Sequence, residues 1–552
     1  MRLAALVAVA AVALAACGGG GSGTPPTRAL GSTDINPRAR DNVRDGGDLR
    51  LPLDLLPSNF NINEVDGPNT DLGSIDIAVL PRTFNATADG GTALNTDYLT
   101  SADVTSTAPQ VVTYTINPKA VWSDGSPITW RDFQVYWQAL NGKNPAYQVA
   151  GTNGYADIVS VTRGSDDRQA VVTFAKPYGE WKTLFTPLTP ASLNADPNTF
   201  NTAWRTNMPL TSGPFVMQSI DQTAKTVILA RNPKWWGAPA KLNRIIFQYY
   251  DTKATADALA NNELDLMGIG GELDLLRRAQ QIPGVTVRNA PGRFAFNVTL
   301  NGGAGSTLAD LPVRQAVAQS IDRQEITRQQ LGQSVPGVQP DGSHFFAPGE
   351  KEYQDNSGVL PYDPAHAEHL LDGAGWTRPS PNAPRAKNGK PLSVRLVYGT
   401  DPSNTEMAKA VQNELARVGI TVVLTEVDPS QFFPTYINRG NFDLALLGWQ
   451  STPSPLGDAA GIFQQPLGNN VQQNYGRIAT PEIDSLITKG LAELDDTTRA
   501  AITNQIDRLV WQEAHSVILF AVPGLRAARS NLANLGSPGF ADPDFINGGF
   551  VK

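Results

Sequence analysis

Residues 391–427 read PLSVRLVYGTDPSNTEMAKAVQNELARVGITVVLTEV, and this stretch decides the fold class. Its two ends are rich in β-branched residues, which favour strands. We expect Ser403 and Glu406 to form a capping box at the start of a helix, and Gly419 to end it. A strand, a helix and a strand in this order predict two parallel strands and an α/β fold. The apolar face of the helix is predicted at Met407, Val411, Leu415 and Val418.

Other segments extend this pattern along the chain. FDLALLGW at 442–449 is typical of a buried strand. Asp363 and Thr480 each precede a proline, which predicts that a helix begins at each of these places. Segments 111–117 and 168–174 are expected to lie in antiparallel strand pairs. We therefore expect mixed sheets.

The composition is that of an acidic globular protein without disulfides. The chain has 552 residues and a net charge of −8, and 41% of its residues are hydrophobic. No long basic run occurs, so nucleic acid is not an expected partner. The length predicts about two to four domain-sized units. Cys17 is the only cysteine, so the core must hold together by packing.

The first residues predict a secretory signal peptide followed by a lipid anchor. Arg2 precedes a short apolar run, and LAA stands directly before Cys17. This resembles the bacterial lipobox, in which the thiol is diacylated; the alternative is an ordinary signal peptide with a chance cysteine. We predict a signal peptide at 1–16 and a flexible tether at 17–45. The protein is then extracytoplasmic and anchored to the outer face of the cell membrane through Cys17.

No motif of an enzyme or of a cofactor site stands out. NGGAGST at 301–307 lacks the lysine of a P-loop, and no G-x-S-x-G elbow occurs. His366 and His369 are spaced to face one metal ion on a helix, but no third ligand is evident. A solvated helix face is the simpler interpretation. We predict a protein that is not an enzyme and has no metal and no cofactor.

A series of motifs is more informative. VWSDGSPITWRDF at 121–133 contains a turn, a cap formed by Thr129 and Asp132, and a packed helix. It is followed in order by SGPFVM, LARNPKWWG, ALANNELDLM, LADLPVRQAVAQSIDRQEI, YDPAHAEHLLDGAGW and NYGRIATPEIDSLI. Together these stretches closely resemble the oligopeptide/dipeptide/nickel-binding family, family 5, of extracytoplasmic solute-binding proteins of ABC importers. The whole most resembles the oligopeptide-binding lipoproteins of mycobacteria and related actinobacteria.

The resemblance implies a two-lobed fold of the periplasmic-binding-protein type II kind. Two β crossovers join the lobes, and they are expected near 294–300 and 517–522. One lobe is split into two sub-domains. The implied division places lobe 1 at 46–82, 205–293 and 516–552, its extra sub-domain at 83–204, and lobe 2 at 294–515.

The resemblance also implies a function. A lipid-anchored monomer is expected to capture peptides, oligopeptides above all, in a cleft between the lobes and to deliver them to the permease and ATPase of an ABC importer. Two alternatives keep the fold: a role in cell-envelope assembly without transport, and binding of a non-peptide solute. A surface hydrolase is a third alternative, for which the sequence offers no nucleophile and base.

Ligand-binding residues follow from the same resemblance. In peptide binders of this family an aspartate soon after the G-W pair of lobe 2 holds the terminal ammonium of the peptide. That position falls on Thr452 here, and Asp458 is six residues further along. A ligand held mainly by backbone and aromatic contacts is therefore expected, such as a peptide with a blocked N-terminus. The predicted cleft is lined by Asp66, Trp449, Gln450, Ser451, Thr452, Asn474 and Tyr475.

Overall fold

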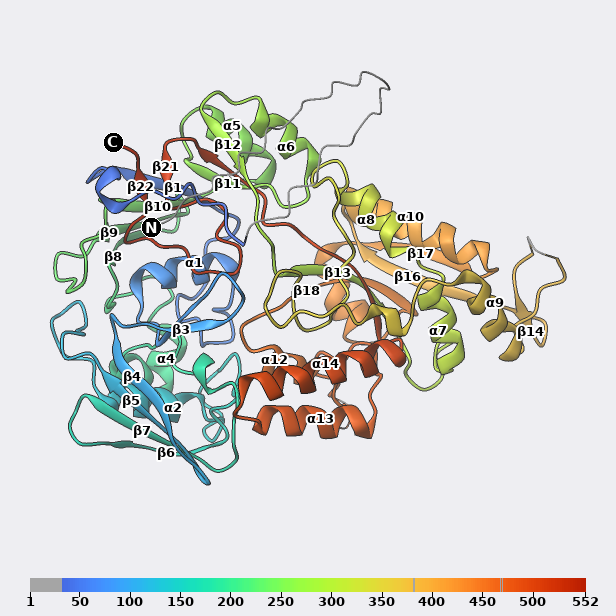
Figure 1. Ribbon diagram of the computed structural model, residues 1–552, viewed down its shortest axis with the longest axis horizontal. Helices are drawn as coiled ribbons and strands as arrows, with labels where there is room; N and C mark the ends of the chain where they lie inside the picture. The colour runs from blue at the N-terminus through green and yellow to red at the C-terminus, as the bar shows by residue number, and fades with distance from the viewer. Residues whose placement is uncertain (1–31, 381–382, 467, 469) are drawn as a thin grey trace, which may run out of the picture.

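The computed structural model describes residues 32–380, 383–466, 468 and 470–552. The signal peptide predicted at 1–16 and the lipidation site Cys17 lie outside these residues. The chain forms two lobes side by side, with the N-terminal part on one side and the segment that contains β16, β17 and α10 on the other (Figure 1). The α/β class and the two-lobed architecture predicted from the sequence are confirmed.

Lobe 2 is built on a five-stranded sheet with the order β17-β16-β18-β13-β19. β16 (Ser393–Gly399) and β17 (Thr421–Val427) are parallel, as predicted, and α10 (Pro402–Arg417) connects them. β18 (Leu444–Gln450) is parallel to β16. β13 (Phe294–Leu300) is antiparallel both to β18 and to β19 (Ser516–Ala521).

The predicted capping box at Ser403 and Glu406 is wrong. α10 begins at Pro402, and the side chain of Asp401 accepts a hydrogen bond from the Ser403 backbone N–H at 2.8 Å. Proline fits the first helical position because it has no N–H to leave unpaired. The predicted helix end holds, because Gly419 has a φ of +84°.

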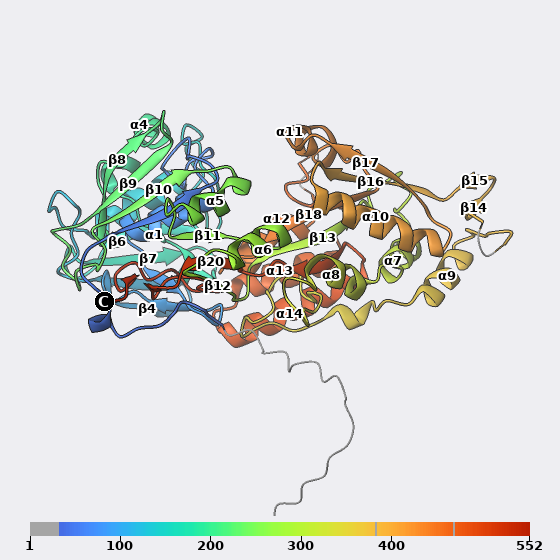
Figure 2. The ribbon, with the colours of Figure 1, turned by 90° about the horizontal axis from the view of Figure 1, so that it is seen from above.

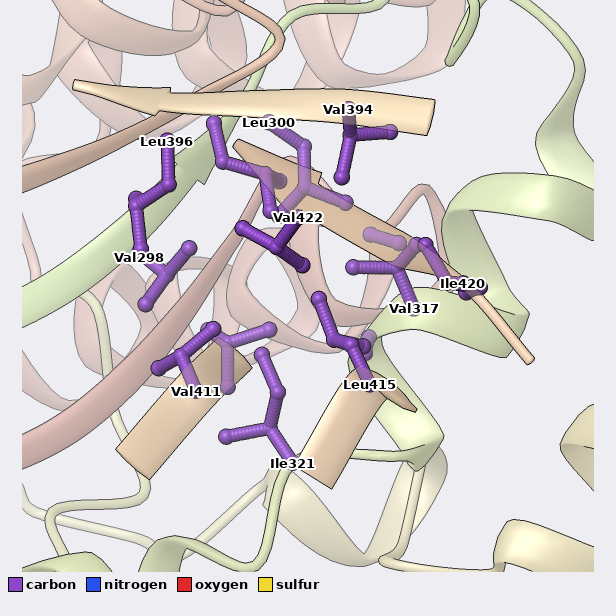
Figure 3. Packing of buried hydrophobic residues seen from close by; sticks show 14 of the residues in the cluster. Val298, Leu300, Val317, Ile321, Val394, Leu396, Val411, Leu415, Ile420 and Val422 are labelled. Atoms are coloured by element: carbon purple, nitrogen blue, oxygen red, sulfur yellow. The ribbon is translucent and has the colours of Figure 1, made fainter. Parts of the chain in front are cut away.

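The core of lobe 2 lies between this sheet and the helices that cover it. Figure 3 shows side chains of β13, β16, β17 and α10 meeting in one cluster. Val411 and Leu415, on the predicted face of α10, are fully buried there. Replacing such a leucine by alanine typically costs about 2–5 kcal/mol of stability. The other labelled members are Val298, Leu300, Val317, Ile321, Val394, Leu396, Ile420 and Val422.

Lobe 1 contains two sheets. The larger has the order β1-β10-β9-β8, in which β1 (Asp48–Leu53) is parallel to β10 (Arg244–Tyr249). β9 (Thr226–Arg231) and β8 (Phe215–Asp221) continue it in antiparallel pairs, and α1 (Thr70–Val79) packs near β8. The smaller sheet has the order β11-β20-β12, formed by Leu266–Gly268, Arg526–Arg529 and Val285–Arg288. α5 (Thr255–Ala260) and α6 (Leu273–Gln280) lie beside this smaller sheet.

An extra sub-domain is attached to lobe 1. Its sheet has the order β4-β5-β7-β6, with bounds Leu99–Thr107, Gln110–Ile116, Gln169–Phe174 and Ile158–Arg163. The antiparallel strand pairs predicted around 111–117 and 168–174 are confirmed, and the structure shows that these segments, as β5 and β7, pair with each other. α2 (Trp130–Leu140) packs on this sheet, and the Asp132 carboxylate accepts from the Thr129 backbone N–H at 2.8 Å.

Further helices and short strand pairs complete the two lobes. The remaining helices are α3 (Ala191–Asn194), α4 (Pro197–Thr202), α7 (Leu311–Gln319), α8 (Arg323–Leu331), α9 (Pro364–Gly373), α11 (Pro429–Gln431) with a π-helical turn at Phe432–Ile437, α12 (Pro455–Phe463), α13 (Pro481–Ala492) and α14 (Asp496–Gln512). Asp363 and Thr480 cap α9 and α13 as predicted. The remaining strand pairs are β2 (Phe84–Ala86) with β3 (Thr92–Leu94), β14 (Ala386–Lys387) with β15 (Lys390–Pro391), and β21 (Leu532–Ala533) with β22 (Gly549–Phe550).

The two connections between the lobes run side by side. The Val522 N–H donates to the Phe294 carbonyl at 2.7 Å, and the Gly524 N–H donates to the Ala290 carbonyl at 2.8 Å. The crossings lie just before β13 and just after β19. The predicted start of the returning part of lobe 1 at residue 516 is therefore wrong, because β19 is a strand of the lobe 2 sheet.

The predicted tether at 17–45 is too long. From Ser32 onward the chain packs on lobe 1: Val43 is fully buried, and Asn36 donates to the Leu532 carbonyl at 2.8 Å. Asp34 and Val43 also form β-bridges with the C-terminal segment. The polar sequence of this segment gave no sign of its packing role, because its contacts are mostly with the backbone of residues far along the chain. No helix in the described part of the chain is long and apolar enough to cross a membrane.

Candidate functional site

Two cavities lie on opposite faces of strand β13. Alternate residues of a strand point to opposite faces of a sheet. Arg293, Ala295 and Asn297 line a small cavity of about 60 Å³ together with Trp449, which we call the Trp449 cavity. Phe294 and Phe296 line a larger one of about 710 Å³ together with Phe433, which we call the Phe433 cavity. Figure 2 shows β13 and β18 on the side of lobe 2 that faces lobe 1, with α11 above them.

An aromatic ladder links the two cavities. The rings of Trp449 and Tyr475 are stacked, with centroids 5.9 Å apart and planes 12° from parallel. The Tyr475 ring is also 5.9 Å from that of Phe433. Stacked rings of this kind offer a flat apolar wall to a ligand.

A carboxylate lies beside Thr452, the position at which the resemblance implies an aspartate. The Thr452 hydroxyl donates to the Asp458 carboxylate and accepts from the Ser454 N–H at 3.0 Å. Asp458 belongs to the first turn of α12 and lines the Trp449 cavity. Burial raises the pKa of the Asp458 carboxyl, and the hydrogen bond from Thr452 partly offsets this. A single helical turn thus brings to Thr452 the negative charge that it lacks.

The extra sub-domain reaches this same loop through Glu180. Glu180 is 4% exposed, and its carboxylate accepts from the N–H groups of Leu456 at 2.9 Å and Gly457 at 2.8 Å. The Ser454 hydroxyl also donates to it. Burial raises the pKa of Glu180 against the effect of these hydrogen bonds. A side chain of lobe 1 therefore caps a helix of lobe 2, and Figure 1 shows α12 beside the sub-domain.

The chain allows this approach because Gly179 has no side chain. A Cβ at this position would lie 1.9 Å from the Glu493 carbonyl oxygen. The Gly179 N–H donates to the Leu491 carbonyl at 2.6 Å, and Lys182 pairs with Asp496 at 2.8 Å. A cavity of about 120 Å³ at this junction shares Thr452 with the Trp449 cavity.

Arg293 and Glu350 form a second junction. Arg293 stands on the first crossing, pairs with Glu350 of lobe 2 and lies 4.7 Å from the ring centroid of Phe540 in lobe 1. The Lys351 N–H donates to the Asp89 carbonyl of the extra sub-domain at 2.8 Å. Burial raises the pKa of Glu350 to about 7, although Arg293 lowers it. Both lobes and the sub-domain meet at this point.

The structure brings together most of the predicted ligand residues, but not all. Trp449, Gln450, Ser451 and Thr452 line the Trp449 cavity, and Tyr475 stacks on its wall. Asn474 is fully buried, and its side chain bonds the carbonyl oxygens of Gln464 and Ile478, each at 2.9 Å.

Asn474 thus has a structural role, in which it closes a loop. Asp66 lies in an exposed loop, where its N–H donates to Glu64 at 2.9 Å. It lines none of the cavities described for the two lobes.

The histidines do not assemble a reactive site. His344 faces the Trp449 cavity, but its Nδ1 lies 2.6 Å from Asp507 and its Nε2 lies 3.2 Å from the Ser516 carbonyl. His366 lies 2.8 Å from the Gln319 side chain. Among the described residues, no three metal-ligating side chains come together. The cavities offer aromatic walls, hydroxyl groups and carboxylates, which suit binding rather than covalent chemistry.

Comparison with known proteins assigns the chain to a protein family. Residues 94–470 match the model of the bacterial extracellular solute-binding proteins, family 5. The chain belongs to this family. The solute-binding protein is 43% identical over 529 residues to the oligopeptide-binding protein OppA of Mycobacterium tuberculosis, covering 95% of this chain and 88% of the relative. A probable monoacyl phosphatidylinositol tetramannoside-binding protein, LpqW, of the same species is 27% identical, covering 82% of this chain and 75% of that one.

Solved structures agree with this assignment. The periplasmic EDTA-binding protein EppA superimposes with a TM-score of 0.85 at 26% identity, covering 96% of this chain and all of that one. The oligopeptide-binding protein AppA of Bacillus subtilis, solved with a nonapeptide, has a TM-score of 0.73 at 18% identity, covering 92% of this chain and all of that one. The family and these relatives are substrate-binding proteins and not enzymes.

Proposed function

We propose that this solute-binding protein captures oligopeptides between its lobes and delivers them to the permease and ATPase of an ABC importer. The observation that carries the proposal is the aromatic ladder from Trp449 through Tyr475 to Phe433, which runs from a carboxylate-bearing cavity to a large apolar one. An extended chain fits such a path better than a compact solute does. The 43% identity to an oligopeptide-binding protein supports the same ligand class.

Closure of the lobes explains how the permease distinguishes the peptide-bound protein from the empty one. The two adjacent crossings form the joint, and the ligand lies between the surfaces that they connect. Removal of water strengthens each polar contact to the enclosed peptide. The peptide must bind the closed form more tightly than the open one, because only a difference in affinity shifts the equilibrium. The closed form is then the one that docks on the permease.

The proposal includes the membrane anchor. Lipidation of Cys17 after removal of residues 1–16 holds the protein at the outer face of the cell membrane. A monomer on a tether stays close to its transporter, which raises the effective concentration of each for the other.

A second candidate function is the binding of a non-peptide solute in the same cleft. The similarity to LpqW, a probable monoacyl phosphatidylinositol tetramannoside-binding protein, and to the EDTA-binding protein EppA supports a non-peptide ligand. The Trp449 cavity contains a cation, Arg293, that a negatively charged solute would need.

Mass spectrometry of the small molecules released from the purified native protein separates these functions. We expect a mixture of peptides, and a synthetic peptide of a recovered sequence should bind the emptied protein in calorimetry. Recovery of a glycolipid or a metal chelate, with no peptide binding, would contradict peptide capture.

A further inference from the structure

The Phe433 cavity has a chemical character that narrows the ligand. It encloses about 710 Å³, and Phe433 and Phe294 on its wall are 43% and 37% exposed, which is unusual for large apolar side chains. The apolar lining also includes Phe296, Phe432, Phe520, Met407 and Leu446. An apolar segment of a ligand would cover this surface.

The charged groups in this cavity are all negative. Its lining contains Glu272 and Asp401 and, within the described chain, no lysine, arginine or histidine. Glu272 precedes α6 in lobe 1, and Asp401 precedes α10 in lobe 2, so the two carboxylates come from opposite sides of the cleft.

Neither carboxylate is fully occupied. Asp401 uses Oδ1 to accept from the Ser403 N–H at 2.8 Å. In the residues that the structure describes, no hydrogen bond reaches Asp401 Oδ2 or the Glu272 side chain. Burial raises the pKa of Glu272, the charge of Asp401 raises it further, Lys253 lowers it, and Asp274 raises it by the smallest amount. Asp401 and Glu272 face the same cavity with like charges, so closure without a cation between them would be opposed by their repulsion.

We propose that the Phe433 cavity binds an apolar peptide segment with a basic side chain, whose positive charge lies between Glu272 and Asp401. This inference rests on the proposed function and names the class of peptide. The aromatic rings favour the same charge, because a cation is attracted to the face of a ring. The positive group lets the lobes close, since it replaces the repulsion by attraction to both carboxylates. A glutamate at the same place is excluded by that same repulsion.

The test uses three amidated heptapeptides of alanine and leucine with a free amino terminus and with lysine, norleucine or glutamate as the sixth residue. Calorimetry on the emptied full-length protein should give a Kd for the lysine peptide at least tenfold lower than for the norleucine peptide, with the glutamate peptide weakest. In a Glu272→Gln, Asp401→Asn double variant, this ratio should fall to about twofold or less. Asparagine keeps the cap of α10 intact.

Asp274→Asn is the matched control, because Asp274 is 81% exposed on α6 and does not line the cavity. It should preserve the tenfold preference. Equal binding of the lysine and norleucine peptides by the native protein, or a preference that survives in the double variant, would overturn this inference alone. Failure of all three peptides to bind would overturn the proposed function together with it.

Discussion

The Glu180 carboxylate accepts the backbone N–H of Gly457 at 2.8 Å, and these two residues belong to different lobes. The first N–H groups of a helix have no partner within the helix, and they carry the positive end of its dipole. Glu180 satisfies two of these groups on α12, the helix that also carries Asp458. The Trp449 cavity and the contact between the lobes therefore share one structural element.

Glu180→Ala should destabilise the protein and loosen the lobes. The change leaves two buried N–H groups without their charged acceptor, which typically costs about 1.5–3 kcal/mol. Urea denaturation should show the loss, and small-angle X-ray scattering of the ligand-free variant should show a larger radius of gyration. Glu482→Ala is the control, because Glu482 is exposed in the first turn of α13. An unchanged radius with unchanged stability would contradict the role given to Glu180.

Glu350 should make the stability depend on pH near neutrality. Its pKa is about 7 in the folded protein against 4.5 ordinarily, so folding takes up a proton between these values. The stabilisation by the protonated form is complete below about pH 4.5 and is lost as the pH rises through about 7, by at most about 3 kcal/mol.

The measurement compares the free energy of unfolding at pH 5 and pH 8 for the native protein and for Glu350→Gln. Glutamine cannot titrate, so the decrease between the two pH values should be smaller in the variant. Glu352→Gln, at a partly exposed neighbouring carboxylate that pairs with Lys351, should keep the native pH dependence. Parallel curves for all three proteins would show that Glu350 does not titrate in this range.

Asp458 should recognise the amino terminus of a bound peptide. Its carboxylate lies at Thr452 in the Trp449 cavity, where a terminal ammonium would find a negative partner. Asp458→Asn should weaken binding of a free-amino peptide about tenfold and change binding of its N-acetylated form little. Calorimetry with both forms decides this. If acetylation has no effect on the native protein, the ligand is held through backbone and aromatic contacts instead.

Two truncations should differ sharply in stability. Removal of residues 1–31 keeps every contact described for lobe 1. Removal of residues 1–44 also takes away the buried Val43, the Asn36 hydrogen bond and the ion pair of Asp34 with Arg288 at 2.8 Å. The longer truncation should lower the free energy of unfolding by about 2–4 kcal/mol, since burial of one valine alone is worth about 1.5–3. Equal melting temperatures for the two proteins would show that this segment does not contribute to stability.

Cys17→Ala should abolish lipidation. The native protein should incorporate a radiolabelled fatty acid. It should also enter the detergent phase on phase separation, because a diacylated cysteine carries the two acyl chains that stable anchoring needs. The variant should carry no label and remain in the aqueous phase if it is released, while Ser22→Ala should behave like the native protein. A labelled Cys17→Ala protein would refute the lipobox interpretation.

The fold was accessible from the sequence because its signals are local. The parallel pair around α10, the caps at Asp363 and Thr480, and the crossing near β13 follow from short patterns and from an ordered series of family motifs. The predicted domain boundaries were wrong where contacts with distant segments of the chain determine the structure. Residues 32–45 look like a linker until the C-terminal segment is placed beside them.

The site was less accessible, because side-chain direction decides it. Trp449 and Thr452, which the G-W pair suggested, line a cavity, whereas the side chain of Asn474 points inward and bonds its own loop. Asp458 seemed too far from Thr452, yet one turn of helix brings them together. Nothing in the sequence near Glu180 indicates that it caps a helix more than 270 residues away.

The alternation along β13 limits how this receptor can be altered. This strand faces one cavity with Ala295 and Asn297 and the other with Phe294 and Phe296, and it continues the joint between the lobes. A one-residue insertion or deletion there would exchange the two linings in a single step, since side chains alternate with a period of two. Point substitutions can change the lining of either cavity separately. A change in the length of this strand would instead exchange the side chains that face the two cavities and would disturb the joint between the lobes at the same time.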